Sequence, residues 1–130
     1  HFMLPHEPYV LDENGNYIPT AKPEVNDMKG YLGQLKYSNK LIRQITDCLL
    51  QDTIRKKIII FQGDHGYRSY TNAPVSASYG ALCAVYFYNK DYTDLKKTLS
   101  HVNTYRVILN NCFNYNIPLL KDSIVFRIGQ

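Results

Sequence analysis

The 130-residue chain lacks tryptophan and has only three cysteines, which are far apart. No C-x-x-C spacing occurs among Cys48, Cys83 and Cys112, so the cysteines give no sign of a metal site. Cys48 and Cys83 lie within apolar patterns, which predicts buried thiols outside disulfides. Because both lie on apolar faces, neither is assigned a role as a nucleophile.

Long apolar runs are also missing. No stretch approaches the roughly 18 apolar residues of a membrane span, and no signal-peptide pattern is present. The chain starts at His1 inside what reads as a strand. We therefore expect a piece of a longer polypeptide, whose membrane or export signals would not be visible in this sequence.

Clusters of charged residues of one sign are few. Its net charge of +4 is spread along the sequence, with 55–57 and 96–97 as the only tight basic groups. Nucleic-acid binding predicts a longer basic stripe, so nucleic acid is not expected as a partner, whereas a mild positive field suits an anionic substrate. With 45% hydrophobic and 20% charged residues, residues 1–130 are expected to form a single globular domain.

Local patterns predict alternating strands and helices. A helix is expected over 31–51, with Asn26 or Asp27 as its N-cap, because apolar residues recur at helical spacing. With a first strand at 1–4 and a buried strand at 58–61, this helix is typical of a parallel βαβ crossover. The remaining expected elements are a surface hairpin or Ω-loop within 10–30, a strand at 81–88, a helix at 103–113 and an edge strand at 124–127.

The candidate site follows the strand at 58–61, in the run Gln-Gly-Asp-His-Gly. The flanking glycines let the backbone turn sharply, and Asp64 and His65 offer one carboxylate oxygen and one imidazole nitrogen. Such a pair suits zinc, manganese or a similar divalent ion. The alternative is a polar turn in which His65 caps a neighbouring helix, since two residues do not make a complete site.

Three further side chains are candidates. His6 stands between two prolines in Pro-His-Glu-Pro-Tyr, and in a parallel sheet it leaves at the same edge as the Asp-His pair. Arg68 follows that pair closely and either contacts an anion or lies on the surface. His101 precedes a predicted helix, where a capping or surface role is favoured over metal ligation.

In order, these motifs resemble the C-terminal half of a sulfatase-like domain of the alkaline phosphatase superfamily. The resemblance is greatest to its membrane-anchored branch, which includes phosphoglycerol transferases. It covers nearly all 130 residues and rests on five stretches: Leu-Pro-His-Glu-Pro-Tyr, Tyr-Leu-Gly-Gln-Leu-Lys-Tyr-Ser-Asn-Lys, Ile-Ile-Ile-Phe-Gln-Gly-Asp-His-Gly, Ser-His-Val-Asn-Thr-Tyr-Arg-Val-Ile-Leu-Asn and Pro-Leu-Leu-Lys-Asp.

The resemblance implies an α/β fold with a mostly parallel sheet flanked by helices. It implies that Asp64 and His65 ligate a catalytic divalent ion (Mn, Zn, Ca or Mg). It also implies that His6 contacts the ester or a second metal, with a catalytic role as proton donor to the leaving oxygen. Arg68, from its position alone, is the other residue expected to contact the substrate. The implied substrate is an anionic phosphate or sulfate ester of lipid or glycan type. The implied reaction is hydrolysis or transfer, at the membrane or on the periplasmic or extracellular face.

The departure from the family pattern is as informative. The family's nucleophile and another metal-binding acid lie on segments N-terminal to anything in this sequence. We therefore expect this piece to be soluble, to bind metal weakly and to be inactive without the missing N-terminal half, with open sheet edges that allow dimerisation. Two other interpretations stay open: a non-catalytic anion- or glycan-binding domain of the same fold, and an unrelated small α/β domain.

Overall fold

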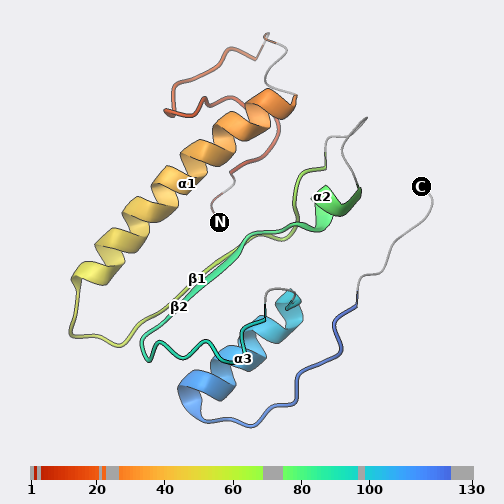
Figure 1. Ribbon diagram of the computed structural model, residues 1–130. Coiled ribbons are helices and arrows are strands. Elements are labelled where there is room, and N and C mark those ends of the chain that lie inside the picture. The colour runs from red at the N-terminus through yellow and green to blue at the C-terminus, as the bar shows by residue number, and fades with distance from the viewer. Residues whose placement is uncertain are drawn as a thin grey trace. The chain divides into compact units, whose positions relative to one another are not determined.

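A computed structural model describes residues 2, 4–20, 22, 27–68, 75–96 and 99–123 (Figure 1). The chain divides into two compact units: unit 1 comprises residues 1–56 and 61–84, and unit 2 comprises 57–60 and 85–130. The helices and strands are, in order, α1 (Met28–Gln51), β1 (Ile58–Gln62), α2 (Val75–Tyr79), β2 (Cys83–Phe87) and α3 (His101–Phe113).

The sheet differs from the prediction. Within the described residues, β1 and β2 form a two-stranded antiparallel sheet, and the N–H of Gly63 continues the pairing by donating to the Leu82 carbonyl over 2.8 Å. The predicted mostly parallel sheet flanked by helices is therefore wrong, and this chain does not have an alkaline-phosphatase-like fold.

The error has a local cause. Phe2 and Leu4 lie outside any strand, which removes the expected first strand of the crossover, while His1 and Met3 lie outside the described residues. The helix between β1 and β2 is only five residues long, and the second strand runs back beside the first. The edge strand predicted at 124–127 also lies outside the described residues.

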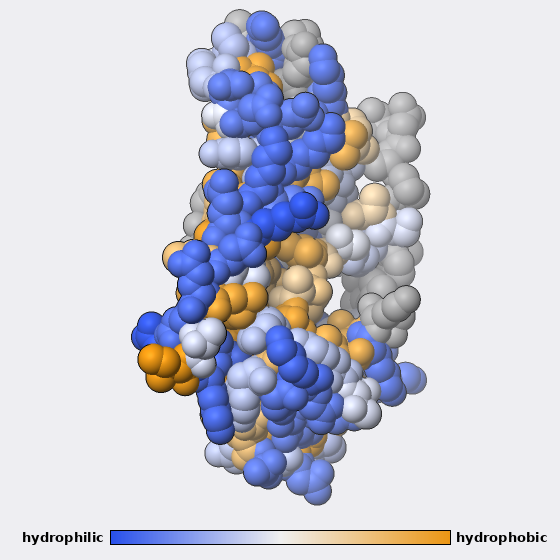
Figure 2. Space-filling view, turned by 60° about the vertical axis from the view of Figure 1, so that its left-hand side comes forward, coloured by the Kyte–Doolittle hydropathy of each residue, from blue (hydrophilic) through white to orange (hydrophobic). Residues whose placement is uncertain are grey.

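Helix α1 begins where its cap predicts. The Asp27 carboxylate accepts the N–H of Gly30 over 2.9 Å, which satisfies one of the unpaired donors of the first turn. The buried stripe, however, consists of small and polar residues four apart: Gly30, Gln34 and Ser38. Three of the large apolar residues that give 31–51 its helical spacing, Leu32, Ile45 and Leu49, are exposed. Figure 2 shows such hydrophobic side chains at the surface among polar ones.

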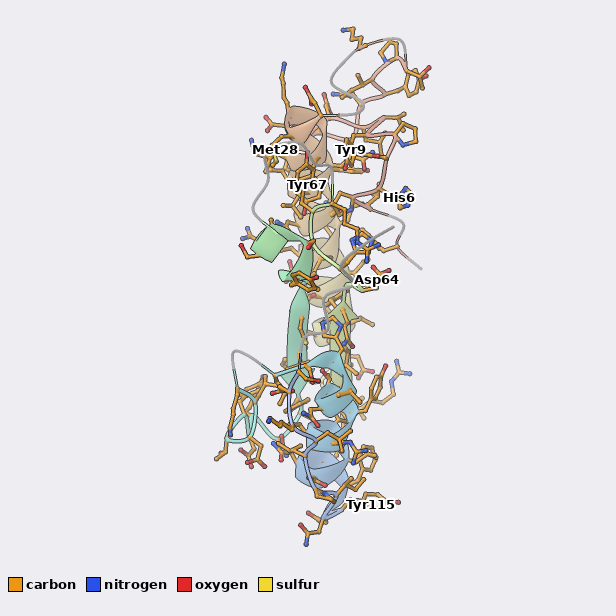
Figure 3. The ribbon with its side chains drawn as sticks, turned by 90° about the vertical axis from the view of Figure 1, so that its right-hand side faces the viewer. His6, Tyr9, Met28, Asp64, Tyr67 and Tyr115 are labelled. Carbon is orange, nitrogen blue, oxygen red and sulfur yellow. The ribbon has the colours of Figure 1, made fainter. Side chains whose placement is uncertain are left out.

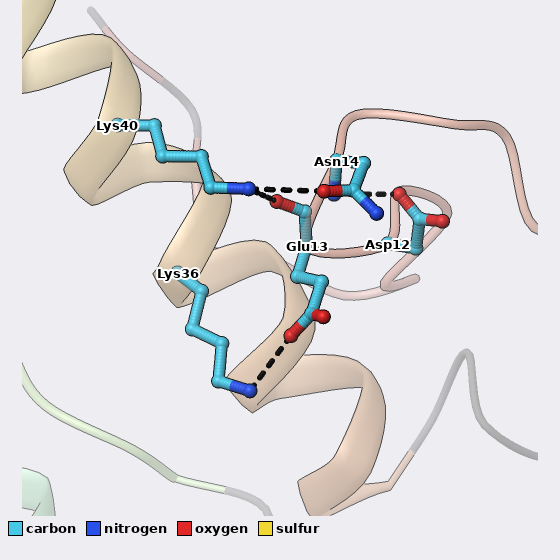
Figure 4. Close-up of polar contacts among 5 residues, drawn as sticks. All are labelled: Asp12, Glu13, Asn14, Lys36 and Lys40. Atoms are coloured by element: carbon cyan, nitrogen blue, oxygen red, sulfur yellow. Dashed lines mark hydrogen bonds and ion pairs between the residues drawn. The ribbon is translucent and has the colours of Figure 1, made fainter.

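The predicted surface hairpin is confirmed before α1. Leu11 and Tyr17 form an antiparallel bridge, and the Asp12 carboxylate closes the turn by accepting the N–H groups of Asn14 and Asn16, each over 2.8 Å. Two lysines of α1 hold the tip of the hairpin (Figure 4). Lys36 pairs with the Glu13 carboxylate over 2.7 Å, and Lys40 donates to the Glu13 carbonyl and the Asn14 side chain.

Unit 2 contains the apolar core of Phe87, Val107 and Ile108. The other side chains packed against this core are Ile58, Ile60, Val85, Leu95, Leu99 and Cys112. The strands predicted at 58–61 and 81–88 and the helix predicted at 103–113 are confirmed within one or two residues at each end. In β1, Ile59 is buried and its neighbours are half-buried, so the strand is less enclosed than predicted.

The cysteine prediction is wrong for two thiols. Cys48 on α1 and Cys83 at the start of β2 are both exposed. Cys112 is half-buried on α3. Among the described helices, none combines the length and apolar character that crossing a membrane would require.

Candidate functional site

The Asp-His-Gly loop leaves β1 and is held at both ends by backbone contacts. At its start, Gly63 pairs with Leu82, and at its end the N–H of Gly66 donates to the Ser78 carbonyl over 2.8 Å. A side chain at Gly66 would overlap the Ala77 carbonyl, so this close approach to α2 requires glycine. The loop is thus fixed around the two residues between these contacts.

Asp64 and His65 present their polar atoms together. Asp64 Oδ1 lies 3.8 Å from His65 Nε2, and their side chains are 88% and 30% exposed. His65 Nδ1 lies 2.7 Å from the Gly66 carbonyl oxygen, which can only accept, so a hydrogen bond here requires a proton on Nδ1; in the neutral ring the lone pair is then on Nε2. The contact is to the adjacent residue and not to a helix terminus, which does not support the capping alternative.

This geometry fits two ligands of one divalent ion. A carboxylate oxygen and an imidazole nitrogen, each about 2.1 Å from a tetrahedral zinc ion, lie about 3.4 Å apart. The observed 3.8 Å is close to that value, and the Asp64 side chain is exposed enough to rotate. A ligating histidine also usually donates its other ring N–H to a carbonyl or carboxylate, as His65 does.

His6 has the same local arrangement on the proline-flanked loop. Its ring is exposed, and its Nδ1 lies 2.6 Å from the carbonyl oxygen of the next residue, Glu7. Its backbone N–H donates to Oε1 of Gln34 on α1 over 3.1 Å. The loop is thereby tied to the helix while Nε2 of the imidazole is directed away from the Glu7 carbonyl.

Three tyrosines connect the two loops through α1. Tyr9, three residues after His6, packs edge-on against Tyr31 with ring centroids 5.8 Å apart. Tyr31 packs against Tyr67, two residues after His65, at 4.5 Å. Burial, and then the neighbouring Tyr67, raise the pKa of Tyr31. Both loops are therefore joined to α1 by aromatic contacts, whereas the parallel sheet that predicted their convergence on one pocket is absent from the described residues.

The tyrosine contacts do not bring the three candidate ligands, His6, Asp64 and His65, into one cluster. In the described part of the chain, no group of three or more His, Cys, Asp or Glu side chains could hold a metal ion. Figure 3 shows the Asp64 side chain set apart from that of His6. The structure therefore places Asp64 beside His65 and ties the His6 loop to α1, and in the described residues these three side chains do not form one cluster.

The two remaining candidates, Arg68 and His101, lie in different parts of the chain. Arg68 is exposed immediately after the buried Tyr67. His101 is the first residue of α3, next to the N-cap position of Ser100, where a structural role was favoured. Sequence reasoning missed the tyrosine contacts and Gln34; the only signal was that both histidine motifs are closely followed by tyrosine.

Comparison with protein-family models, curated proteins and solved structures found no match. Function is therefore inferred from the side chains themselves. Asp64 and His65 offer one carboxylate and one imidazole, donors that suit borderline divalent ions such as zinc and manganese.

Proposed function

We propose that this chain is part of a divalent-metal-dependent enzyme that hydrolyses or transfers phosphoric or sulfuric esters. Asp64 and His65 would hold the ion. The observation that supports this is the 3.8 Å separation of Asp64 Oδ1 and His65 Nε2, with His65 Nδ1 turned to the Gly66 carbonyl. The order of the Asp-His-Gly and Pro-His-Glu-Pro-Tyr motifs supports the same reaction class.

The residues have separate roles in this proposal. When bound, a divalent ion neutralises charge that develops on the ester oxygens and lowers the pKa of an attacking hydroxyl. His6 hydrogen-bonds the ester or donates a proton to the leaving oxygen, for which an exposed imidazole is suited. Arg68 attracts the anionic group of a lipid- or glycan-type ester, because its guanidinium stays charged.

The proposed site needs more than this chain. Catalytic and structural zinc sites use three or four protein ligands, whereas this pair supplies two. We propose that an N-terminal half supplies the nucleophile and another acidic ligand, and that the whole enzyme works at a membrane or on its outer face. The chain alone should then bind metal weakly and not turn over substrate.

Calorimetric titration with Mn²⁺ and Zn²⁺ tests the metal site. Asp64→Ala and His65→Ala should each remove most of the binding heat of the wild-type chain. The matched control is Asp94→Ala, which deletes an exposed acid of unit 2 and should leave the heat unchanged. Equal heats in all four proteins would contradict metal ligation by this pair.

A second function is favoured by one observation, the absence of a third ligand among the described residues. A non-catalytic domain would use the exposed His6 and Arg68 to bind an anion or glycan without metal. Titration with inorganic phosphate and sulfate in excess chelator separates the two. Binding that survives the chelator and is lost in Arg68→Ala supports the binding domain; binding that requires metal supports the enzyme.

A further inference from the structure

Both histidine loops are anchored on the N-terminal half of α1, by different side chains. Tyr31 lies between Tyr9 and Tyr67, one from each loop. Gln34, almost one turn further along the helix, holds the backbone of His6. We propose that Tyr31 and Gln34 are positioning residues that set the separation between His6 and the Asp64–His65 pair. This inference rests on the proposed function, in which those three residues act on one substrate.

Tyr31 acts through short connections. Only two residues separate Tyr9 from His6, and only one separates Tyr67 from His65. An extended chain spans at most about 3.6 Å per residue. Over such short connections, a displacement of either tyrosine ring also moves the histidine near it. Tyr9 and Tyr67 are 4% and 9% exposed, which leaves both rings little room to move independently of Tyr31.

Gln34 acts on His6 alone. It is 1% exposed, and its Oε1 accepts the His6 N–H over 3.1 Å, across 28 residues of sequence. A buried carboxamide is costly to leave unpaired, so this contact fixes the height of the His6 loop along α1. Ser38, the next buried residue of the stripe, donates its hydroxyl to the Gln34 carbonyl over 2.8 Å.

The choice of residue favours positioning over simple packing. An apolar side chain at position 34 would fill the same buried space without the cost of desolvating an amide. A glutamine there selects one register of the loop, because its oxygen must meet a backbone N–H. Likewise, any large apolar residue could separate Tyr9 from Tyr67, but only an aromatic ring makes the edge-on contact to Tyr9 and the tilted contact to Tyr67.

Paramagnetic broadening of the histidine ring signals by Mn²⁺ measures the separation in the full chain. Mn²⁺ held by Asp64 and His65 should broaden the His65 signals most and those of His6 by an amount that falls with the sixth power of distance. A displacement of about 1 Å at about 10 Å changes that broadening about twofold, and displacements of this size are the ones that matter for chemistry. Tyr31→Leu and Gln34→Leu should change the His6 to His65 broadening ratio by about that factor. Tyr31→Phe keeps the aromatic ring and should leave this ratio at its wild-type value.

A measurement without metal keeps the inference separate from the proposed function. Tyr31→Leu should shift the ring signals of both His6 and His65, whereas Gln34→Leu should shift only those of His6 and speed hydrogen exchange of its amide. If Mn²⁺ fails to broaden His65 in the wild type, the proposed metal site is wrong, and these shifts still decide the inference. If either variant folds with both histidines unshifted and the broadening ratio unchanged, positioning by that residue is wrong.

Discussion

The Asn103 side chain pairs with both backbone groups of Leu120. Its Nδ2 donates to the Leu120 carbonyl over 2.8 Å, and the Leu120 N–H donates to its Oδ1 over 2.9 Å. Two turns along α3, Asn110 does the same with Ile117, at 2.9 and 2.8 Å. The segment 117–122, here called the C-terminal strap, thus runs antiparallel to α3. The Asn103 and Asn110 carboxamides bond its backbone N–H and C=O groups.

Removing the Asn103 carboxamide should loosen the strap and destabilise unit 2. Asn103 is 1% exposed, and Asn103→Ala leaves the two backbone groups of Leu120 without their partner. We expect a loss of about 2–3 kcal/mol in the free energy of unfolding. Urea denaturation followed by circular dichroism measures it. The exposed Asn116 is the matched control, and Asn116→Ala should stay within about 0.5 kcal/mol of wild type.

Acid should release the end of the strap. The Asp122 carboxylate accepts the Ser100 N–H and the Asn103 amide, each over 3.0 Å. The Ser100 hydroxyl is buried nearby without reaching hydrogen-bonding geometry with a described residue. The Ser100 side chain, then its N–H, and also Asn103, lower the pKa of Asp122 below its ordinary 3.8.

A lowered pKa in the folded state fixes the sign of the effect. The contact contributes its full stability above pH 3.8 and loses it as pH falls through the lower, folded-state pKa. An NMR titration of the Ser100 amide should show this transition below pH 3.8 in the wild type and not in Asp122→Asn. An identical titration in both proteins would show that Asp122 does not control the strap.

Two glycines of unit 1 should respond oppositely to alanine. Gly15 has φ +85°, and a Cβ there would lie 2.5 Å from the Tyr37 ring. Gly15→Ala should therefore cost about 1–3 kcal/mol in stability. At Gly33 in α1 the nearest atom to a new Cβ is 3.6 Å away, so Gly33→Ala should stabilise by about 0.5–1 kcal/mol. Thermal unfolding compares them; equal effects would contradict the packing of the hairpin on α1.

The three thiols should differ in reactivity. Cys48 and Cys83 are exposed, whereas burial and then the charge of Asp91 raise the pKa of the half-buried Cys112. Because the thiolate is the reactive form, iodoacetamide should modify Cys112 about tenfold more slowly than the other two in the native chain. Peptide mass spectrometry after timed labelling gives the three rates. Labelling in urea should make them equal, and native rates that are already equal would contradict the burial of Cys112.

Local sequence determined the existence and approximate limits of the regular elements. The Asp27 cap starts α1 as predicted, the apolar run at 58–61 forms β1, and the Asp-Glu-Asn-Gly-Asn turn forms the hairpin. The cap and the turn depend on contacts within a few residues, namely a capping carboxylate and a side chain that bonds its own turn. The Asp-His pair is local in the same sense, since its spacing follows from two adjacent residues on a glycine-flanked bend.

Only the tertiary structure decided how those elements pair and which faces they bury. A hydrophobic run such as 58–61 can pair with a parallel or an antiparallel neighbour. Its antiparallel pairing with β2 depends on the residues that connect the two strands. Gln34, in the buried stripe of α1, bonds the backbone of the His6 loop, and the spacing of apolar residues along the helix does not reveal such a polar contact. The meeting of Tyr9, Tyr31 and Tyr67 joins residues far apart in sequence, and such long-range contacts leave no trace in local patterns.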